Sequence, residues 1–175
     1  MDDLLQFPNI TSVLETYAEE LRKLYRENLV KSDALATEQL YNTATYQVTR
    51  DGLTWEVSLS LQDYWKYVEE GTKPHWPSEE AITKWVRVKP VIPRPDAFGR
   101  IPSEKSLVYL IRRKIAREGT EGRHDLLNAV QECNRRFLRD LETACQLDID
   151  NLASVAIQSL ADKPSKNQTK IKQRG

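Results

Sequence analysis

The sequence contains few of the residue types from which catalytic and metal-binding sites are built. Its two histidines and two cysteines show no C-x-x-C or H-x-x-x-H spacing, and its six glycines form no phosphate-binding loop. No G-x-S-x-G motif places a nucleophilic serine near either histidine. Asp96 with Glu104 and Lys105 comes closest to a nuclease site, but Asp96 lies among prolines. We therefore expect no enzyme activity, no cofactor, no metal and no small-molecule substrate.

Long hydrophobic runs are also absent. No segment approaches the roughly 18 apolar residues that span a bilayer, and the first residues lack the basic and apolar regions of a signal peptide. We expect an intracellular chain without a membrane partner. Cys133 and Cys145 are 12 residues apart in one helix-periodic stretch, or roughly 18 Å along a helix. They are therefore predicted to be unpaired thiols in the core.

The chain has no net charge, because 26 basic residues balance 26 acidic ones. The charges are nevertheless segregated. Residues 1–70 hold 13 acids and 6 bases, whereas residues 84–117 hold 2 acids and 10 bases. Residues 118–162 return to 9 acids and 4 bases, and residues 163–175 hold 5 bases and no acid. Solvated helix faces explain part of this pattern, but it also suits a protein that offers surfaces of opposite charge to different neighbours, including copies of itself.

The first half of the chain predicts two helices and a hairpin. Ser12 and Glu15 have the spacing of a capping box and predict a helix over residues 12–29; a shorter helix is expected over 33–41 after Ser32. Asp51-Gly52 then separates two alternating segments and predicts a two-residue turn. This turn would pair residue 50 with 53 and place six apolar side chains on one face, namely Ala44, Tyr46, Val48, Trp55, Val57 and Leu59.

The second half is mainly helical. Asp63 is predicted to cap a helix over 64–70 that Gly71 ends in the left-handed conformation, and Ser78 to open the next helix. Prolines make residues 90–102 an extended loop, after which Ser103 opens a helix that Gly119 stops. In that helix the residues expected to face inward are Leu107, Leu110, Ile111 and Ile115. A long helix begins at Asp125; its second apolar set is Ile149, Leu152, Val155 and Ala156.

These elements predict an α+β fold. Residues 1–161 are expected to form one domain, in which a long N-terminal helix and a hairpin-based antiparallel sheet pack against three or four helices. Residues 162–175 are expected to be a flexible, basic, disordered tail. The predicted partner-binding residues of this tail are Lys163, Lys166, Lys170, Lys172 and Arg174.

An aromatic-rich segment, residues 64–77, contains five aromatic rings, counting that of His75, and two prolines. Such a composition suits either an ordinary corner of the core or an exposed docking surface. Its candidate docking residues are Tyr64, Trp65, Tyr67, Glu70, Gly71 and Trp76. The tripeptide Glu-Gly-Thr ends this helix at residues 70–72 and recurs at 118–120 after another helix.

The order of these motifs resembles the small neck, or tail-completion, proteins of tailed bacteriophages. Members of that family commonly show Y-x-x-Y-V-E-x-G-T, then a Trp-Val helix, then I-x-R-K-I-x-x-x-G-T and a last helix. The corresponding positions here are Tyr64–Thr72, Trp85-Val86 and Ile111–Thr120. The likeness extends from about Ser12 to Leu160, although the proline-rich loop and the basic tail depart from the family's pattern.

The resemblance implies a structural virion protein that is not an enzyme. It would form a homo-oligomeric ring, of six or twelve copies, in the neck between the portal or adaptor and the tail, after assembly in the host cytoplasm. Basic side chains would then face an acidic neighbour or contact packaged double-stranded DNA without reading its sequence. The candidates are Arg94, Arg100, Arg112, Arg113, Lys114 and Arg117. The alternative is a small intracellular nucleic-acid-binding or regulatory protein that uses helix 103–118 and the tail directly.

Overall fold

The computed structural model describes residues 6–32, 39–89, 91–95 and 98–161. It has an α+β fold, as predicted, with six helices and two small antiparallel sheets in this part of the chain. The elements are α1 (Pro8–Lys31), α2 (Gln39–Thr43), β1 (Thr45–Asp51), β2 (Thr54–Ser60), α3 (Trp65–Glu70), β3 (Gly71–Thr72), α4 (Glu79–Val88), α5 (Glu104–Glu118), β4 (Thr120–Glu121) and α6 (Asp125–Ala161).

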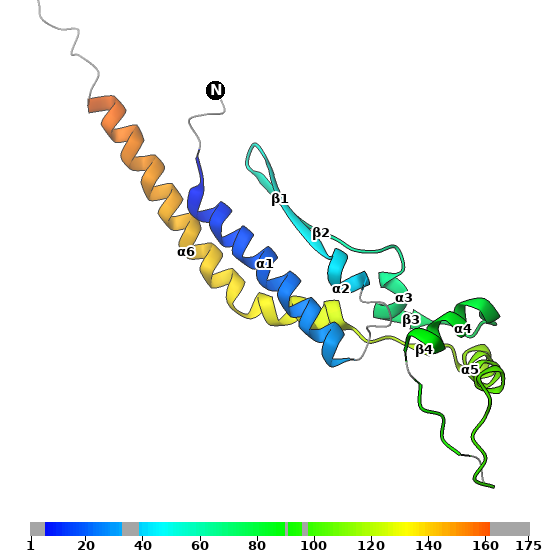
Figure 1. Cartoon of the computed structure of the whole chain (residues 1–175). Coiled ribbons are helices and arrows are strands. Elements are labelled where there is room, and N and C mark those ends of the chain that lie inside the picture. The colour runs from blue at the N-terminus through cyan, green and yellow to red at the C-terminus, as the bar shows by residue number, and fades with distance from the viewer. Residues whose placement is uncertain (1–5, 33–38, 90, 96–97, 162–175) are drawn as a thin grey trace, which may run out of the picture.

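The body of the molecule is elongated and is built around α1. Figure 1 shows α6 running alongside one side of α1 and the β1–β2 hairpin along another. Helices α4 and α5 pack together at one end of the body, and the last turns of α6 lie at the opposite end. The molecule therefore presents two well-separated ends.

Two apolar clusters follow the length of α1. One surrounds its second half and includes the buried Tyr25 and Leu29 with Ala129 and Cys133 of α6. The other surrounds its first half, where Ile10 and Leu14 meet Ala144. Because α1 contributes to both clusters, its amphipathic pattern connects α6 with the hairpin.

The start of α1 differs from the prediction. The helix begins at Pro8, so Ser12 and Glu15 lie inside it and form no capping box. Proline is favourable at a first helical position because it lacks an N–H that would be unsatisfied there. The next N–H groups are satisfied by Asp148 of α6, whose carboxylate accepts from the backbone N–H of Asn9 at 3.2 Å and of Ile10 at 2.9 Å. A residue 138 positions away thus replaces the local cap.

The predicted hairpin is present, but its predicted register is wrong by two residues. Asp51 pairs with Thr54, and the loop is Gly52-Leu53. The favoured two-residue turns need a positive φ at their first position, and Gly52 supplies it with φ of 59°. Because a shift of two keeps side chains on the same face, the apolar face survives with new partners. The pairs on it are Tyr46–Leu59, Val48–Val57 and Arg50–Trp55.

Both ends of α3 also differ from the prediction. Asp63 does not cap α3, whose N-cap is Tyr64 without a side-chain hydrogen bond. Gly71 has the expected positive φ, 76°, but its ψ of −167° is extended rather than left-handed helical. The chain therefore leaves α3 directly into strand β3, which pairs with β4.

The predicted starts of α4 and α5 are confirmed. The hydroxyl of Ser78 accepts from the backbone N–H of Ala81, and that of Ser103 accepts from the N–H of Ser106. The predicted inward face of α5 is only partly correct, because Val108 is its buried residue and Leu110 is 49% exposed. Helix α5 packs mainly on the short α4, so only a narrow stripe of it is covered.

Some predictions lie outside the described residues. One is the first part of the helix predicted for residues 33–41; α2 covers the end of that range and continues to Thr43. The other is the whole tail, residues 162–175. Within the described residues, no helix combines the length and the apolar character needed to cross a membrane.

Candidate assembly surfaces

The aromatic segment divides into an inward and an outward half. Tyr64 and Trp65 are partly buried and pack against the cluster around the second half of α1. Tyr67 and Trp76 are 65% and 51% exposed, and Glu70 is exposed. The segment is therefore both a corner of the core and a surface.

The two Glu-Gly-Thr tripeptides meet in the β3–β4 pair. Gly71 lies opposite Glu121 and Thr72 opposite Thr120, whose hydroxyls are 3.0 Å apart. A Cβ on Gly71 would lie 2.1 Å from the carbonyl oxygen of Thr120, and one on Gly119 would lie 2.0 Å from that of Thr72. Both glycines also have positive φ. Each glycine is thus required because the other strand's backbone occupies the space of a side chain.

Glu69 connects the end of α3, next to the β3–β4 pair, to the start of α6 through hydrogen bonds. Its buried carboxylate accepts from the backbone N–H of Leu126 at 2.9 Å and of Leu127 at 2.8 Å. A carboxylate is favourable here because the first N–H groups of a helix have no partner within it and carry partial positive charge. The glutamate of the Y-x-x-Y-V-E-x-G-T segment is therefore a helix cap supplied from another part of the chain.

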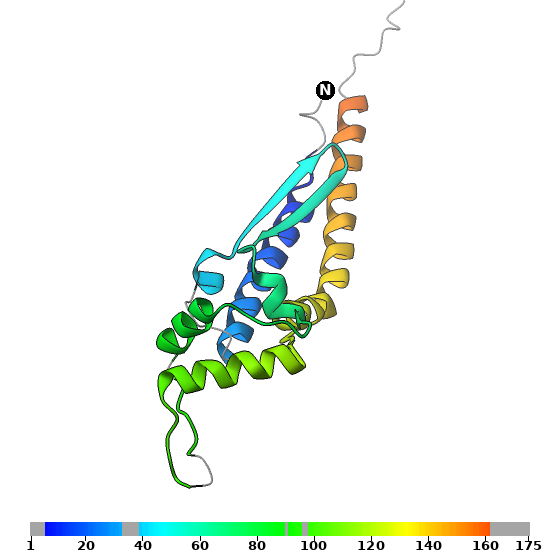
Figure 2. The same ribbon diagram turned by 90° about the vertical axis from the view of Figure 1, so that its right-hand side faces the viewer.

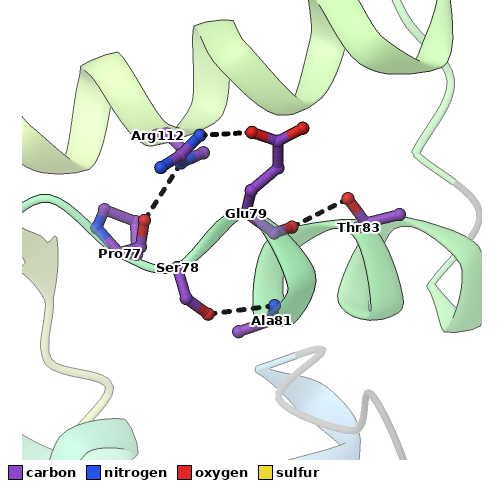
Figure 3. A network of polar contacts seen from close by, with 6 residues as sticks. All are labelled: Pro77, Ser78, Glu79, Ala81, Thr83 and Arg112. Atoms are coloured by element: carbon purple, nitrogen blue, oxygen red, sulfur yellow. Dashed lines mark hydrogen bonds and ion pairs between the residues drawn. The ribbon is translucent and has the colours of Figure 1, made fainter.

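Arg112 does not belong with the other basic residues of α5. Its side chain is only 16% exposed and bonds the carbonyl oxygen of Pro77 at 3.0 Å and the carboxylate of Glu79 at 2.9 Å, as Figure 3 shows. Its guanidinium also lies 5.1 Å from the ring centroid of Trp76. The prediction that grouped it with exposed basic residues is therefore wrong, because Arg112 holds α4 against α5.

The outer face of α5 carries the remaining bases. Arg113, Lys114 and Arg117 are exposed. Arg117 bonds the adjacent Glu118, and this hydrogen bond lowers the pKa of the Glu118 carboxyl. Two large apolar side chains lie on the same face, Tyr109 at 52% and Leu110 at 49% exposure. We call these five side chains the basic face of α5; they are Tyr109, Leu110, Arg113, Lys114 and Arg117.

The described parts of the connection between α4 and α5 extend away from the body (Figure 2). Arg94 and Arg100 are both exposed there, and the guanidinium of Arg100 lies 5.1 Å from the ring centroid of Phe98. Ile92 and Phe98 are 89% and 81% exposed. The described residues of the loop thus present basic and apolar side chains together, at the end of the molecule opposite to the hairpin tip (Figure 1).

The last third of α6 is the second apolar surface. Ile149, Leu152, Ala156 and Leu160 recur at spacings of three and four, and every residue from 153 to 161 is exposed. Val155 and Ile157 flank this stripe at 60% and 68% exposure. The sequence identified a second apolar set here without assigning it a partner. In the structure α1 begins at Pro8, near Asp148, and does not extend along this part of α6. We call residues 147–161 the distal segment of α6.

The described residues contain no cluster of three or more histidine, cysteine, aspartate or glutamate side chains that could hold a metal. A groove of about 820 Å³ runs along α1, but acidic and basic side chains alternate around it. Burial raises the pKa of the Cys133 thiol to about 11 and also raises that of the Asp125 carboxyl. The Cys133 thiol lies in the apolar cluster around the second half of α1, and the Asp125 carboxylate accepts a hydrogen bond from the hydroxyl of Ser32 at 2.7 Å.

Comparisons of the chain with protein-family models, with characterised proteins and with solved structures found no match. Of the predicted contact residues, the structure brings Arg113, Lys114 and Arg117 together, separates Arg94 and Arg100 on the loop, and assigns Arg112 to an internal contact. The five tail residues lie outside the described ranges. Sequence reasoning missed the helix-capping roles of Glu69 and Asp148, which depend on contacts between distant segments.

Proposed function

We propose that this chain is a structural protein of a tailed-bacteriophage particle. It forms an oligomeric ring in the neck, joins the portal or its adaptor to the tail, and surrounds the channel through which DNA passes. The partners are copies of itself and the portal, adaptor and tail proteins, with non-specific contact to double-stranded DNA. The motif order described above supports the proposal. It is also supported by the finding that both Glu-Gly-Thr motifs contribute to the single β3–β4 pair.

The observation that carries the proposal is the presence of two exposed, partly apolar surfaces at opposite ends of an elongated subunit. One is the basic face of α5 and the other is the distal segment of α6. Ring assembly by head-to-tail contacts requires two different, complementary surfaces on each copy. The basic loop side chains Arg94 and Arg100 lie at the α5 end and suit contact with an acidic neighbour or with phosphates.

Localisation in the particle tests the proposal. Virions of the phage that encodes the chain would be purified and imaged with an antibody or fusion label against the hairpin tip. The expected result is label at the junction of head and tail, and separate filled heads and tails when the gene carries a stop codon. Absence from purified particles would refute it.

The second candidate is a nucleic-acid-binding protein, which the exposed Arg113 and Lys114 favour. A free monomer that binds DNA tightly at low salt, with affinity falling steeply as salt rises, would support this alternative. Weak DNA affinity together with self-association supports the ring.

A further inference from the structure

We infer that copies of the chain join head to tail, with the distal segment of α6 of one copy seated on the basic face of α5 of the next. This inference specifies the subunit contact of the proposed ring and rests on that proposal for its biological setting. The contact itself follows from four properties of the two surfaces, namely exposure, apolar content, charge and position.

The distal segment is an exposed helical end with an apolar stripe. Helical segments of about a dozen residues are marginal in water unless an apolar face is packed. Here the stripe of Ile149, Leu152, Ala156 and Leu160 continues past Asp148, whose carboxylate is hydrogen-bonded to the first turn of α1. Val155 and Ile157 widen it. A helix with this pattern is suited to lie against another apolar surface.

The basic face of α5 offers such a surface. Tyr109 and Leu110 are about half exposed at the centre of the helix, and the bases Arg113, Lys114 and Arg117 follow within two turns. A central apolar contact with charged side chains around it is the usual composition of a protein interface. A DNA backbone would use the bases but would leave Tyr109 and Leu110 in water, so the composition favours a protein partner.

The charges of the two surfaces are complementary. From residue 140 to residue 161, α6 contains four acids and no base. The exposed Asp150 lies within the distal segment and the exposed Glu142 lies seven residues before Ile149, whereas Asp148 is buried in the cap of α1. Opposite charges at the edge of an interface speed encounter and fix register. They also disfavour pairing of a surface with its own copy, because like charges would then meet.

The positions of the two surfaces decide the topology. Residue 149 lies 24 residues beyond the start of α6, or about 36 Å along a helix. The α4–α5 pair lies at the opposite end of the body (Figures 1 and 2). One copy therefore cannot close the contact on itself. A contact between two different surfaces adds subunits in one direction and ends in a ring where the rotation closes.

Charge reversal on each surface provides the test. The first variant carries Arg113→Glu and Lys114→Glu, and the second carries Glu142→Lys and Asp150→Lys. Each variant alone should weaken self-association about tenfold or more, because its two surfaces now carry charge of the same sign. Mixing the two variants should restore it, since the reversed α5 face of the first matches the two reversed acids of the second, of which Glu142 precedes the distal segment and Asp150 lies within it. Their two unaltered surfaces also match.

Sedimentation velocity of the full chain over a concentration series gives the association constants, and circular dichroism verifies that each variant is folded. The control reverses two exposed bases of α6 outside both surfaces, Arg135→Glu and Arg136→Glu, and should associate like the unaltered chain. A second background that ends at Ala161 removes the five bases adjacent to the distal segment. There, association and its restoration on mixing should persist.

The apolar part of the contact is tested separately with Ile157→Ser and Leu160→Ser. Both side chains are more than 60% exposed, so the fold should be unaffected while self-association falls at least tenfold. The inference is overturned if the unaltered chain stays monomeric throughout the concentration series, if the single variants associate normally, or if mixing fails to restore association. A chain that is present in the neck but behaves in one of these ways keeps the proposed function and loses only this contact. A chain whose association is restored on mixing, but which is absent from virions, keeps this contact and loses the proposed function.

Discussion

The carboxylate of Asp148 accepts a hydrogen bond from the backbone N–H of Ile10 at 2.9 Å, although 138 residues separate the two in the chain. Asn9 donates to the same carboxylate from both its backbone and its side-chain nitrogen. The first turn of α1 is therefore capped from the interior of α6, and the contact fixes how far the two helices slide along each other.

Asp148→Ala should lower the free energy of unfolding by about 2 to 4 kcal/mol, because it leaves buried N–H groups without an acceptor. Urea denaturation followed by circular dichroism measures the change. Asp150→Ala, two residues away on the exposed side of α6, should stay within about 0.5 kcal/mol of the unaltered chain. Equal effects of the two substitutions would contradict the capping role.

Gly71→Ala and Gly119→Ala should each destabilise the fold by about 3 kcal/mol or more, since a methyl group would overlap the carbonyl oxygen of the paired strand. Gly52→Ala is the matched control. Gly52 also has positive φ, but nothing lies within 4 Å of its Cβ position, so the cost should be about 1 kcal/mol. Thermal unfolding of the three variants separates the cost of steric overlap from the cost of positive φ. A similar loss of stability in all three would mean that backbone strain alone matters.

Arg112→Glu should destabilise the fold, whereas Arg113→Glu should leave its stability almost unchanged. Arg112→Glu removes the hydrogen bond to Pro77 and places a carboxylate beside Glu79, so it should destabilise the α4–α5 pair by about 2 kcal/mol. Arg113→Glu changes an exposed side chain and should leave stability within about 0.5 kcal/mol. Hydrogen exchange of the amides in α4 checks this, with faster exchange expected only in the first variant.

The stability of the chain should depend on the protonation of Asp125. Burial raises the pKa of its carboxyl above the ordinary 3.8, and the nearby Glu69 carboxylate adds to the rise, while hydrogen bonding from Ser32 opposes it. The folded state thus holds the proton more tightly than the unfolded state does. The resulting contribution to stability is complete below about pH 3.8 and is lost as the pH rises through the raised pKa.

Asp125→Asn removes this titration and preserves an oxygen that can accept from Ser32. The free energy of unfolding of the unaltered chain, minus that of the variant, should therefore decrease as the pH rises from 3 to 7. Denaturation series at several pH values give this difference. A difference that increases with pH would show that the carboxylate, rather than the acid, is the form stabilised by the fold.

Burial should also make Cys133 slow to react. Its thiol has a pKa raised to about 11, so little thiolate exists at neutral pH. Labelling with a maleimide at pH 8 should modify Cys133 in Cys145→Ser at least about tenfold more slowly than in the same chain unfolded by urea. Equal rates in the two conditions would mean that α1 does not cover this side chain.

Much of the local structure could be predicted because its causes are local. Ser78 and Ser103 cap the helices that follow them, and the alternating residues of the hairpin place the correct side chains on one face. The hairpin register was wrong because Asp51-Gly52 suggested the loop, whereas positive φ was required one position earlier in the turn. The start of α1 was wrong because its cap lies on a distant helix.

The candidate surfaces were predicted less completely. A list of basic residues could not separate Arg112, which turns toward Pro77, from Arg113, which points to solvent, since that difference depends on where α4 packs. The apolar stripe of the distal segment was visible in the sequence. Its exposure was not, because it depends on where α1 begins relative to α6.

The β3–β4 pair has one further consequence. Residues 73–119 leave the body after Thr72 and return at Thr120, and these two positions are paired neighbours whose hydroxyls are hydrogen-bonded. The segment that contains α4 and α5 is therefore connected to the rest of the fold through two adjacent residues, as an inserted segment would be. Its length and surface can change in related chains without moving α1, α6 or the hairpin, provided that both glycines remain. Fit to a different neighbour can thus evolve in this unit while the supporting framework stays constant.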